Sequence, residues 1–166
     1  MRALIVPLAA MLLLSGCGLR PLYGSNAAAP ARALLAGVQV APIAGQSGWL
    51  MTTALRDRLA AVDAGTPQYR LDVRLDDSIT GLGIRRSDDS VSRERRTLRA
   101  RYQLVELANG AVVLDATAGS DAGIDVVGSE YATIAAEQTA IERLAGTVAD
   151  QIVARLALYA HRAPRP

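Results

Sequence analysis

Tyr69-Arg70-Leu71-Asp72-Val73-Arg74-Leu75-Asp76 is the stretch of sequence that decides the fold, because it alternates apolar and charged residues without a break. Successive side chains of a β-strand point to opposite faces of a sheet. The alternation therefore predicts a strand with all of its apolar residues on a buried face and all of its charges on the other.

Two more strands are expected after this one. The second has Leu98, Ala100, Tyr102 and Leu104 on its apolar face, opposite Arg95, Thr97, Arg99, Arg101 and Gln103. Between the first two strands, Gly81, Gly83 and Asp88-Asp89-Ser90 predict that the first strand frays into a polar turn over residues 78–92. Asn109-Gly110 predicts a hairpin turn, since both residues tolerate positive φ. The third strand then turns Val112, Leu114 and Ala116 inward.

A helix is expected on each side of these three strands. Upstream, Val38, Val40 and Ile43 predict a short strand, and Ser47 is a candidate N-cap for a helix whose apolar residues are Met51, Leu55, Leu59 and Val62. Trp49 is expected to pack beneath this helix. Downstream, Ser129 is expected to cap a helix over 130–159, with an apolar stripe of Ile134, Ile141, Leu144, Val148, Ile152, Leu156 and Tyr159.

The inferred order is strand-helix-strand-strand-strand-helix. It predicts an α+β fold in which two helices pack on one face of a mostly antiparallel four-stranded sheet. Residues 37–161 are expected to form a single domain, and residues 162–166 a disordered tail.

The N-terminus has the layout of an export signal. Arg2 provides a positive start, residues 3–14 an apolar stretch, and Ser15-Gly16 a small cleavage site before Cys17. A membrane span needs about 20 apolar residues, which this stretch does not reach. The pattern resembles the lipobox of bacterial lipoproteins, with a plain cleaved signal or a chance match as the alternatives. We therefore expect a signal peptide over 1–16, acylation of Cys17, and a tether over 17–36.

Composition restricts the remaining function classes. The net charge is +2, so no overall field favours nucleic acid, and all eighteen basic residues are arginine. Cys17 is the only cysteine, so an acylated protein has no thiol for a disulfide or a cysteine-based metal site. We expect no metal and no cofactor.

Catalytic patterns are weak throughout the chain. His161 is the only histidine and lies next to the C-terminal tail, so neither a Ser-His-Asp relay nor a histidine metal site has partners. Gly81-Leu82-Gly83 lacks the third glycine and the setting of a dinucleotide loop. We expect no enzymatic activity, and no catalytic residue is assigned.

Arginines between positions 85 and 101 are the only concentration of one charge sign. Arg99 and Arg101 are explained as cross-strand partners of carboxylates at positions 72, 76 and 115. The others surround a hairpin tip that offers only Asp88, Asp89 and Glu94, which leaves surplus positive charge. Forked guanidinium groups suit phosphate or carboxylate, so these residues are candidates for binding an anionic ligand: Arg85, Arg86, Arg93, Arg95 and Arg96.

Several local strings resemble the LPS-assembly lipoprotein family, LptE. The most distinctive is Cys17-Gly18-Leu19-Arg20-Pro21-Leu22-Tyr23-Gly24, which is similar to the family's mature N-terminus. Further similarity lies in residues 69–73, in the arginine-rich strand through Tyr102-Gln103-Leu104, in Tyr131-Ala132-Thr133, and in residues 149–157.

This resemblance implies a non-enzymatic lipoprotein, anchored on the periplasmic side of the outer membrane, that plugs the LptD β-barrel and helps deliver lipopolysaccharide to the outer leaflet. It also implies two helices on a four-stranded sheet, outer-membrane sorting through Gly18, and lipopolysaccharide as the ligand of the five candidate arginines. The alternative is a periplasmic lipoprotein scaffold that holds a protein complex without touching lipopolysaccharide.

Overall fold

The computed structural model describes residues 29–60, 65–85 and 90–162. The elements follow one another along the chain as α2 (Ala29–Ala36), β1 (Val38–Val40), α3 (Gln46–Ala60), β2 (Tyr69–Arg85), β3 (Ser90–Glu106), β4 (Val112–Asp125) and α4 (Glu130–Arg162). None of the described helices is both long and apolar enough to cross a membrane.

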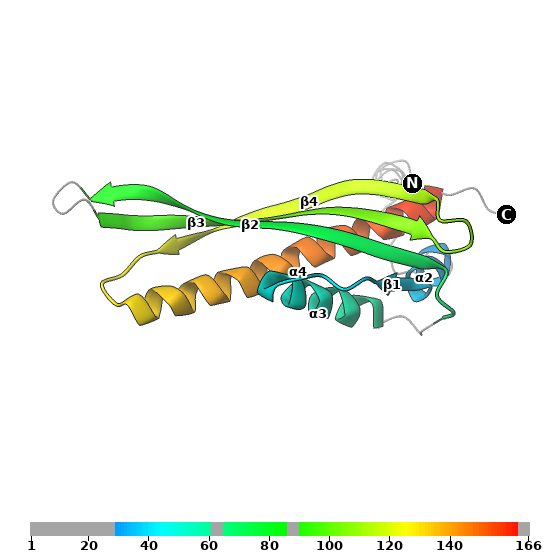
Figure 1. The fold of residues 1–166 in the computed structure, drawn as a ribbon, viewed down its shortest axis with the longest axis horizontal. Helices are drawn as coiled ribbons and strands as arrows, with labels where there is room; N and C mark the ends of the chain where they lie inside the picture. Colours follow the sequence, from blue (N-terminus) through cyan, green and yellow to red (C-terminus); the bar gives the residue numbers. More distant parts are fainter. Residues whose placement is uncertain (1–28, 61–64, 86–89, 163–166) are drawn as a thin grey trace, which may run out of the picture.

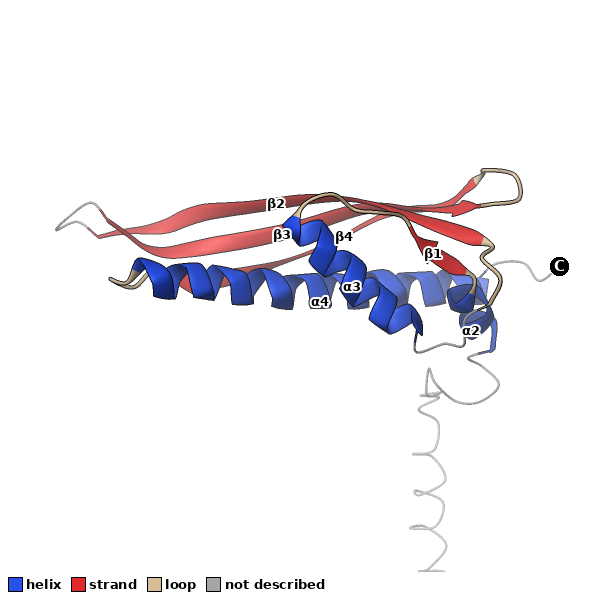
Figure 2. Cartoon of the chain, turned by 60° about the horizontal axis from the view of Figure 1, so that its bottom comes forward, coloured by secondary structure: helices blue, strands red, loops and turns tan. Residues whose placement is uncertain are grey.

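The strands form one twisted sheet in the order β1-β2-β3-β4, with the helices on one of its faces (Figures 1 and 2). β2 to β4 pair antiparallel, whereas β1 pairs parallel with β2, since α3 is the crossover between them. The α+β class is confirmed. The helix count was wrong, because α2 is a third helix.

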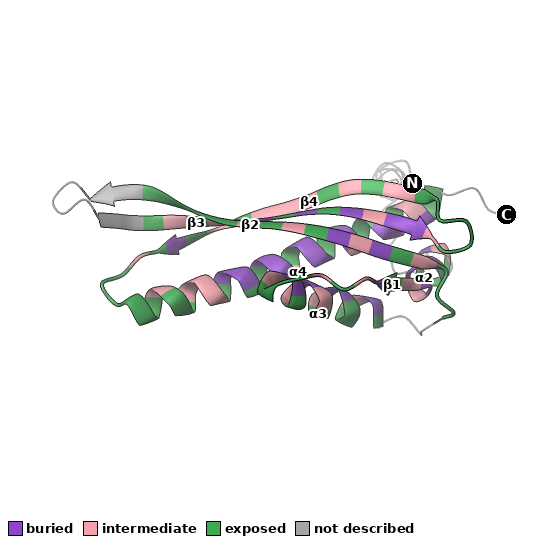
Figure 3. Ribbon diagram, in the orientation of Figure 1, coloured by how far each residue is buried: buried purple, intermediate pink, exposed green. Residues whose placement is uncertain are grey.

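Period-two alternation holds in the central strand. Leu98, Ala100, Tyr102 and Leu104 are all buried on the face covered by helices. The core lies where α3 and α4 pack on this face. Fewer residues are buried towards the β2–β3 tip and in the first turns of α4 (Figure 3).

The long helix α4 covers the sheet with the expected apolar stripe. The N–H of Ala132 donates to Oγ of Ser129 at 3.4 Å, which confirms the cap. Ile141, Ile152 and Leu156 are buried, but Ile134 is exposed, contrary to the prediction. The buried residues of α4 begin at Ala140, so Ile134 lies in the first turns of the helix, where packing against the sheet is sparse.

Residues 29–36 are helical rather than a tether. Ala31, Leu34 and Leu35 of α2 are buried in the main core cluster. Alanine and leucine are strong helix formers, and their burial explains why a segment without clear periodicity is ordered.

The β2–β3 hairpin is much longer than predicted. β2 continues to Arg85, and β3 starts at Ser90. The register is irregular between Gly81 and Ile84, which lets both glycines remain part of the strand. β4 likewise runs on to Asp125, pairing with β3 over its whole length. Val112 at its start is exposed rather than inward. The tight turn before it has Gly110 at a φ of 71°, as expected.

The start of α3 differs from the prediction at two residues. The helix begins at Gln46, so Ser47 lies within its first turn instead of capping it, and Trp49 is exposed rather than packed beneath it. Gly48 is buried against the preceding loop, where a Cβ would lie 2.6 Å from the carbonyl oxygen of Ile43.

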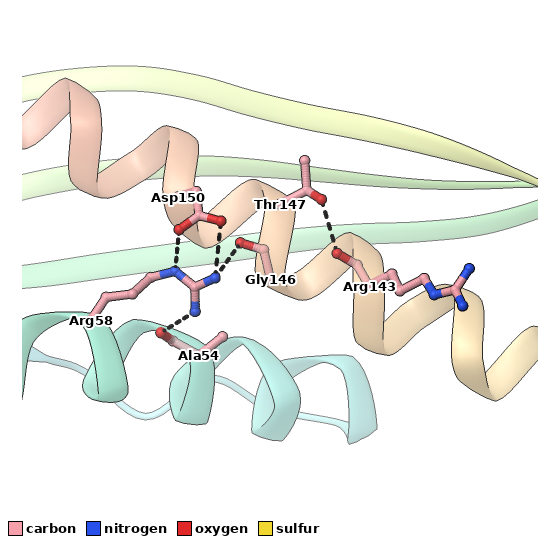
Figure 4. Close-up of polar contacts among 6 residues, drawn as sticks. All are labelled: Ala54, Arg58, Arg143, Gly146, Thr147 and Asp150. Carbon is pink, nitrogen blue, oxygen red and sulfur yellow. Dashed lines mark hydrogen bonds and ion pairs between the residues drawn. The ribbon is translucent and has the colours of Figure 1, made fainter.

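Arg58 of α3 forms hydrogen bonds with α4 (Figure 4). Nη2 of Arg58 donates to Oδ2 of Asp150 and to the carbonyl of Gly146, both at 3.0 Å, while Nη1 donates to the carbonyl of Ala54. The hydrogen bonds to Asp150 and Gly146 hold the crossover helix against the long helix, and the one to Ala54 orients the guanidinium group from within α3.

Candidate functional site

The face of the sheet opposite the helices, called here the open face, is lined by charged side chains. They alternate with the buried residues of the same strands: Arg70, Asp72, Arg74 and Asp76 from β2, Arg93, Arg95, Arg99 and Arg101 from β3, and Asp115, Asp121 and Asp125 from β4. These residues of the open face thus comprise six arginines and five aspartates.

Near the middle of the sheet, charged side chains of the open face pair with each other. Nη2 of Arg101 lies 2.9 Å from Oδ2 of Asp115, and Gln103 donates to the same oxygen at 2.8 Å. These two hydrogen bonds lower the pKa of Asp115. The expected structural role of Arg101 is confirmed. Arg99 stands directly opposite Asp76 in register, but within the described ranges it has no carboxylate within 4.0 Å.

Arg93 and Arg95 lie towards the hairpin tip on the same face. Their side chains are 64% and 53% exposed, and among the described residues they pair with the carboxylates of Asp125 at 3.0 Å and Asp121 at 3.8 Å. The prediction that the tip offers only Asp88, Asp89 and Glu94 was therefore wrong, because β4 extends alongside these arginines. Exposed pairs of this kind typically contribute 0 to about 1 kcal/mol, so both guanidinium groups can exchange a carboxylate for another anion.

Arg96 points to the opposite face, towards the helices. Nε and Nη2 donate to the two carboxylate oxygens of Asp77 at 2.9 and 2.7 Å, and Nη1 donates to the carbonyl of Glu137 on α4 at 3.0 Å. The two side chains are only 15% and 19% exposed. The hydrogen bond to Asp77 is the main cause of the raised pKa of Arg96. Arg96 thus joins the hairpin to α4.

The other predicted site residues are placed less fully. Arg85 is the last residue of β2, paired with Ser90 in register, and Arg86 and Cys17 lie outside the described residues. His161 is exposed in the last turn of α4. In the described part of the chain, no three His, Cys, Asp or Glu side chains are grouped as metal ligands would be.

Sequence reasoning missed the acidic partners of these arginines. Asp121 and Asp125 belong to a segment, Ala118 to Asp125, whose small residues are poor strand formers. The signal was present, since Asp115, Thr117, Gly119, Asp121, Gly123 and Asp125 recur with period two. Asp77 was missed because it breaks the apolar alternation of its strand.

Comparison with known proteins identifies what this chain is similar to. The family model of LptE, described as lipopolysaccharide-assembly, matches residues 35–156. No curated protein matches the sequence.

Solved structures share the fold. A protein described as a lipoprotein from Caulobacter crescentus is 25% identical with a TM-score of 0.66, and the match covers 80% of this chain and 96% of that one. The minor lipoprotein from Acinetobacter baumannii is 15% identical with a TM-score of 0.61, over 80% and 99%. Lipoprotein B from Nitrosomonas europaea is 12% identical with a TM-score of 0.57, over 74% and 82%.

Proposed function

Because the chain belongs to the LptE family of lipopolysaccharide-assembly proteins, we propose that it is an outer-membrane lipoprotein that plugs the LptD β-barrel and assists transfer of lipopolysaccharide to the outer leaflet. The family is a non-enzymatic lipoprotein family, and the proposed role is that of a binding component. Its anchor would be acylated Cys17, on the periplasmic side of the membrane.

The shape of the molecule supports this proposal. α2, the described element nearest to Cys17 in sequence, lies at one end of the elongated domain, and the β2–β3 tip lies at the other (Figure 1). Twelve positions separate Cys17 from Ala29. Such a segment spans at most about 40 Å when extended. One end of the domain is therefore held near the membrane surface, while the other reaches away from the anchor.

The observation that carries the proposed contact with lipopolysaccharide is the exposure of Arg93 and Arg95 on the open face near that far tip. Phosphate accepts two hydrogen bonds from a guanidinium fork in the same geometry as carboxylate, and carries more charge. At 3.8 Å from its nitrogen, Asp121 holds Arg95 loosely, so a phosphate can replace it. Arg85, the last residue of β2, and Arg86, which lies outside the described residues, are included in the same proposed contact.

Arg96 supports this contact rather than making it. Its guanidinium is occupied by Asp77 and by the carbonyl of Glu137 on the covered face. We propose that it holds the hairpin at a fixed angle to α4, so that Arg93 and Arg95 are presented together.

A binding experiment tests the proposed contact. We expect the Arg93→Ala/Arg95→Ala variant to lose most lipopolysaccharide binding in a co-purification assay, and addition of Arg85→Ala and Arg86→Ala to deepen the loss. The matched control is Arg70→Ala/Arg74→Ala, which removes two arginines from the same face at the other end of β2. Circular dichroism and melting verify folding. Equal loss in the control and the test variant contradicts a local site.

The scaffold alternative is favoured by one observation, which is that Arg93 and Arg95 both have carboxylate partners. If those pairs only fasten β4 to β3, then Asp121→Asn/Asp125→Asn lowers stability and leaves lipopolysaccharide binding unchanged. If the arginines bind phosphate, the same substitutions free both guanidinium groups and raise the affinity.

A further inference from the structure

Along the free edge of β4, alternate residues direct their backbone N–H and C=O groups away from the sheet. The hydrogen bond of Gly119 identifies which residues these are. Gly119 donates its N–H not to β3 but to Oε1 of Gln151 on α4, with an N···O distance of 3.2 Å. In an antiparallel ladder, alternate residues direct both backbone groups away from the neighbouring strand. Thr117 and Asp115 lie two and four residues before Gly119 with no register shift between them, so they share this orientation.

These outward groups are available to another chain. Within the described ranges, the outward N–H groups of Asp115 and Thr117 have no hydrogen-bond partner in the protein. A row of unpaired N–H and C=O groups is a template for strand addition, which proteins normally block with proline, lysine or a bulge. From Leu114 to Asp125, β4 contains neither proline nor a basic residue, and its pairing is regular.

A groove accompanies this edge. A cavity of about 440 Å³ lies between residues 115–118 of β4 and the side chains of Gln151 and Arg155 on α4. A second hollow of about 500 Å³, on the open face, shares Thr117, Ala118 and Gln151 with it, so the two hollows adjoin at this part of β4. When an extended peptide adds a strand to an exposed sheet edge, backbone hydrogen bonds give affinity and pockets for its alternate side chains give specificity.

The charges of the groove favour an acidic occupant. Asp115 is already held by Arg101 and Gln103, whereas exposed Arg155 has no ion pair with any residue in the described part of the chain. Leu158 follows Gln151 by seven residues and therefore lies on the same face of α4, where it is 42% exposed. The α4 side of the groove thus presents the amide of Gln151, the guanidinium of Arg155, which has no ion pair in the described part of the chain, and the apolar side chain of Leu158.

We propose that an extended, acidic segment of another envelope protein adds to β4 as a fifth strand in this groove. Its backbone pairs with the outward groups of Asp115 and Thr117, and one of its carboxylates binds Arg155. Gln151 marks the end of the added strand, since it already occupies the N–H of Gly119. The groove follows the free edge of β4, whereas Arg93 and Arg95 lie on the open face of the interior strand β3. The proposal does not depend on lipopolysaccharide binding.

Site-directed crosslinking in native envelopes tests this proposal with the full-length lipoprotein. A photoreactive amino acid replaces Leu158, which leaves the strand edge intact, and the crosslinked segment is mapped by mass spectrometry. Thr117→Pro removes one outward N–H without breaking the ladder to β3. Arg155→Glu reverses the groove charge, and Arg143→Glu is the matched control at another exposed position of α4.

We expect one protein adduct whose segment contains Asp or Glu. It should fall about tenfold in both Arg155→Glu and Thr117→Pro, as the loss of about 1.4 kcal/mol of binding free energy requires, and stay unchanged in Arg143→Glu. An adduct only to lipid or to a second copy of the chain overturns the proposal. So does the absence of any adduct, a segment without acidic residues, or an adduct insensitive to either substitution.

Discussion

Removal of Arg96 is the perturbation that most sharply separates a structural arginine from a ligand-binding one. Arg96→Ala breaks two charge-assisted hydrogen bonds to Asp77 and one to the carbonyl of Glu137, and it leaves a carboxylate that is 19% exposed without its cation. Exposed pairs contribute 0 to about 1 kcal/mol, and breaking a fully buried pair costs about 3 to 5 kcal/mol. For a pair that is mostly buried, we expect a loss of about 2 to 3 kcal/mol.

Urea unfolding measures this loss directly, and thermal melting should show a Tm lowered by about 4 to 12 °C. The partner variant Asp77→Ala and the double variant complete a double-mutant cycle, for which we expect a coupling free energy of about 1 to 2 kcal/mol. Coupling near zero, or an Arg96→Ala variant of full stability that has lost lipopolysaccharide binding, would refute the structural role given to this residue.

Three further outcomes are expected. Gly48→Ala should cost about 1 to 3 kcal/mol in urea unfolding, because its Cβ would lie 2.6 Å from the carbonyl oxygen of Ile43, whereas Gly123→Ala, with open space around it, should be nearly neutral. The hydrogen bond from Arg58 lowers the pKa of Asp150 in the folded protein. The ionised carboxylate therefore stabilises the fold at a pH above its ordinary pKa of about 4, and this contribution is lost as the pH falls through the lowered pKa. In the Asp150→Asn variant, the free energy of unfolding should therefore fall less below a pH of about 4. Mass spectrometry of the mature N-terminus should find acylated Cys17, and an unmodified thiol contradicts the proposed anchor.

The parts of the fold that follow from periodicity were predictable. Tyr102 and its neighbours on β3 alternate so regularly that only one face can be buried, and the stripe from Ile141 to Leu156 needs a sheet to cover it. These two patterns are enough to specify helices packed on one face of a sheet.

The parts that depend on a neighbour were not predictable. Gly81 and Gly83 favour a turn locally, yet both belong to β2 because β3 pairs with them through an irregular register. The end of β4 is a strand because β3 is alongside it, and α2 is ordered because the core covers Leu34 and Leu35. Tertiary context overrode local propensity in each case.

The candidate site shows the same division. The positions of Arg93 and Arg95 on the open face follow from alternation alone, and so does the opposite direction of Arg96. Their partners do not, since the register of β2 with β3 places Asp77 beside Arg96, and the register of β3 with β4 places Asp121 beside Arg95.

Isolation of the lipidated protein from outer membranes in mild detergent tests the central proposal most directly. We predict that it co-purifies with one large β-barrel protein, LptD, in equal amounts, and with bound lipopolysaccharide that the Arg93→Ala/Arg95→Ala variant lacks. Recovery of the protein without a large β-barrel partner contradicts the proposed function.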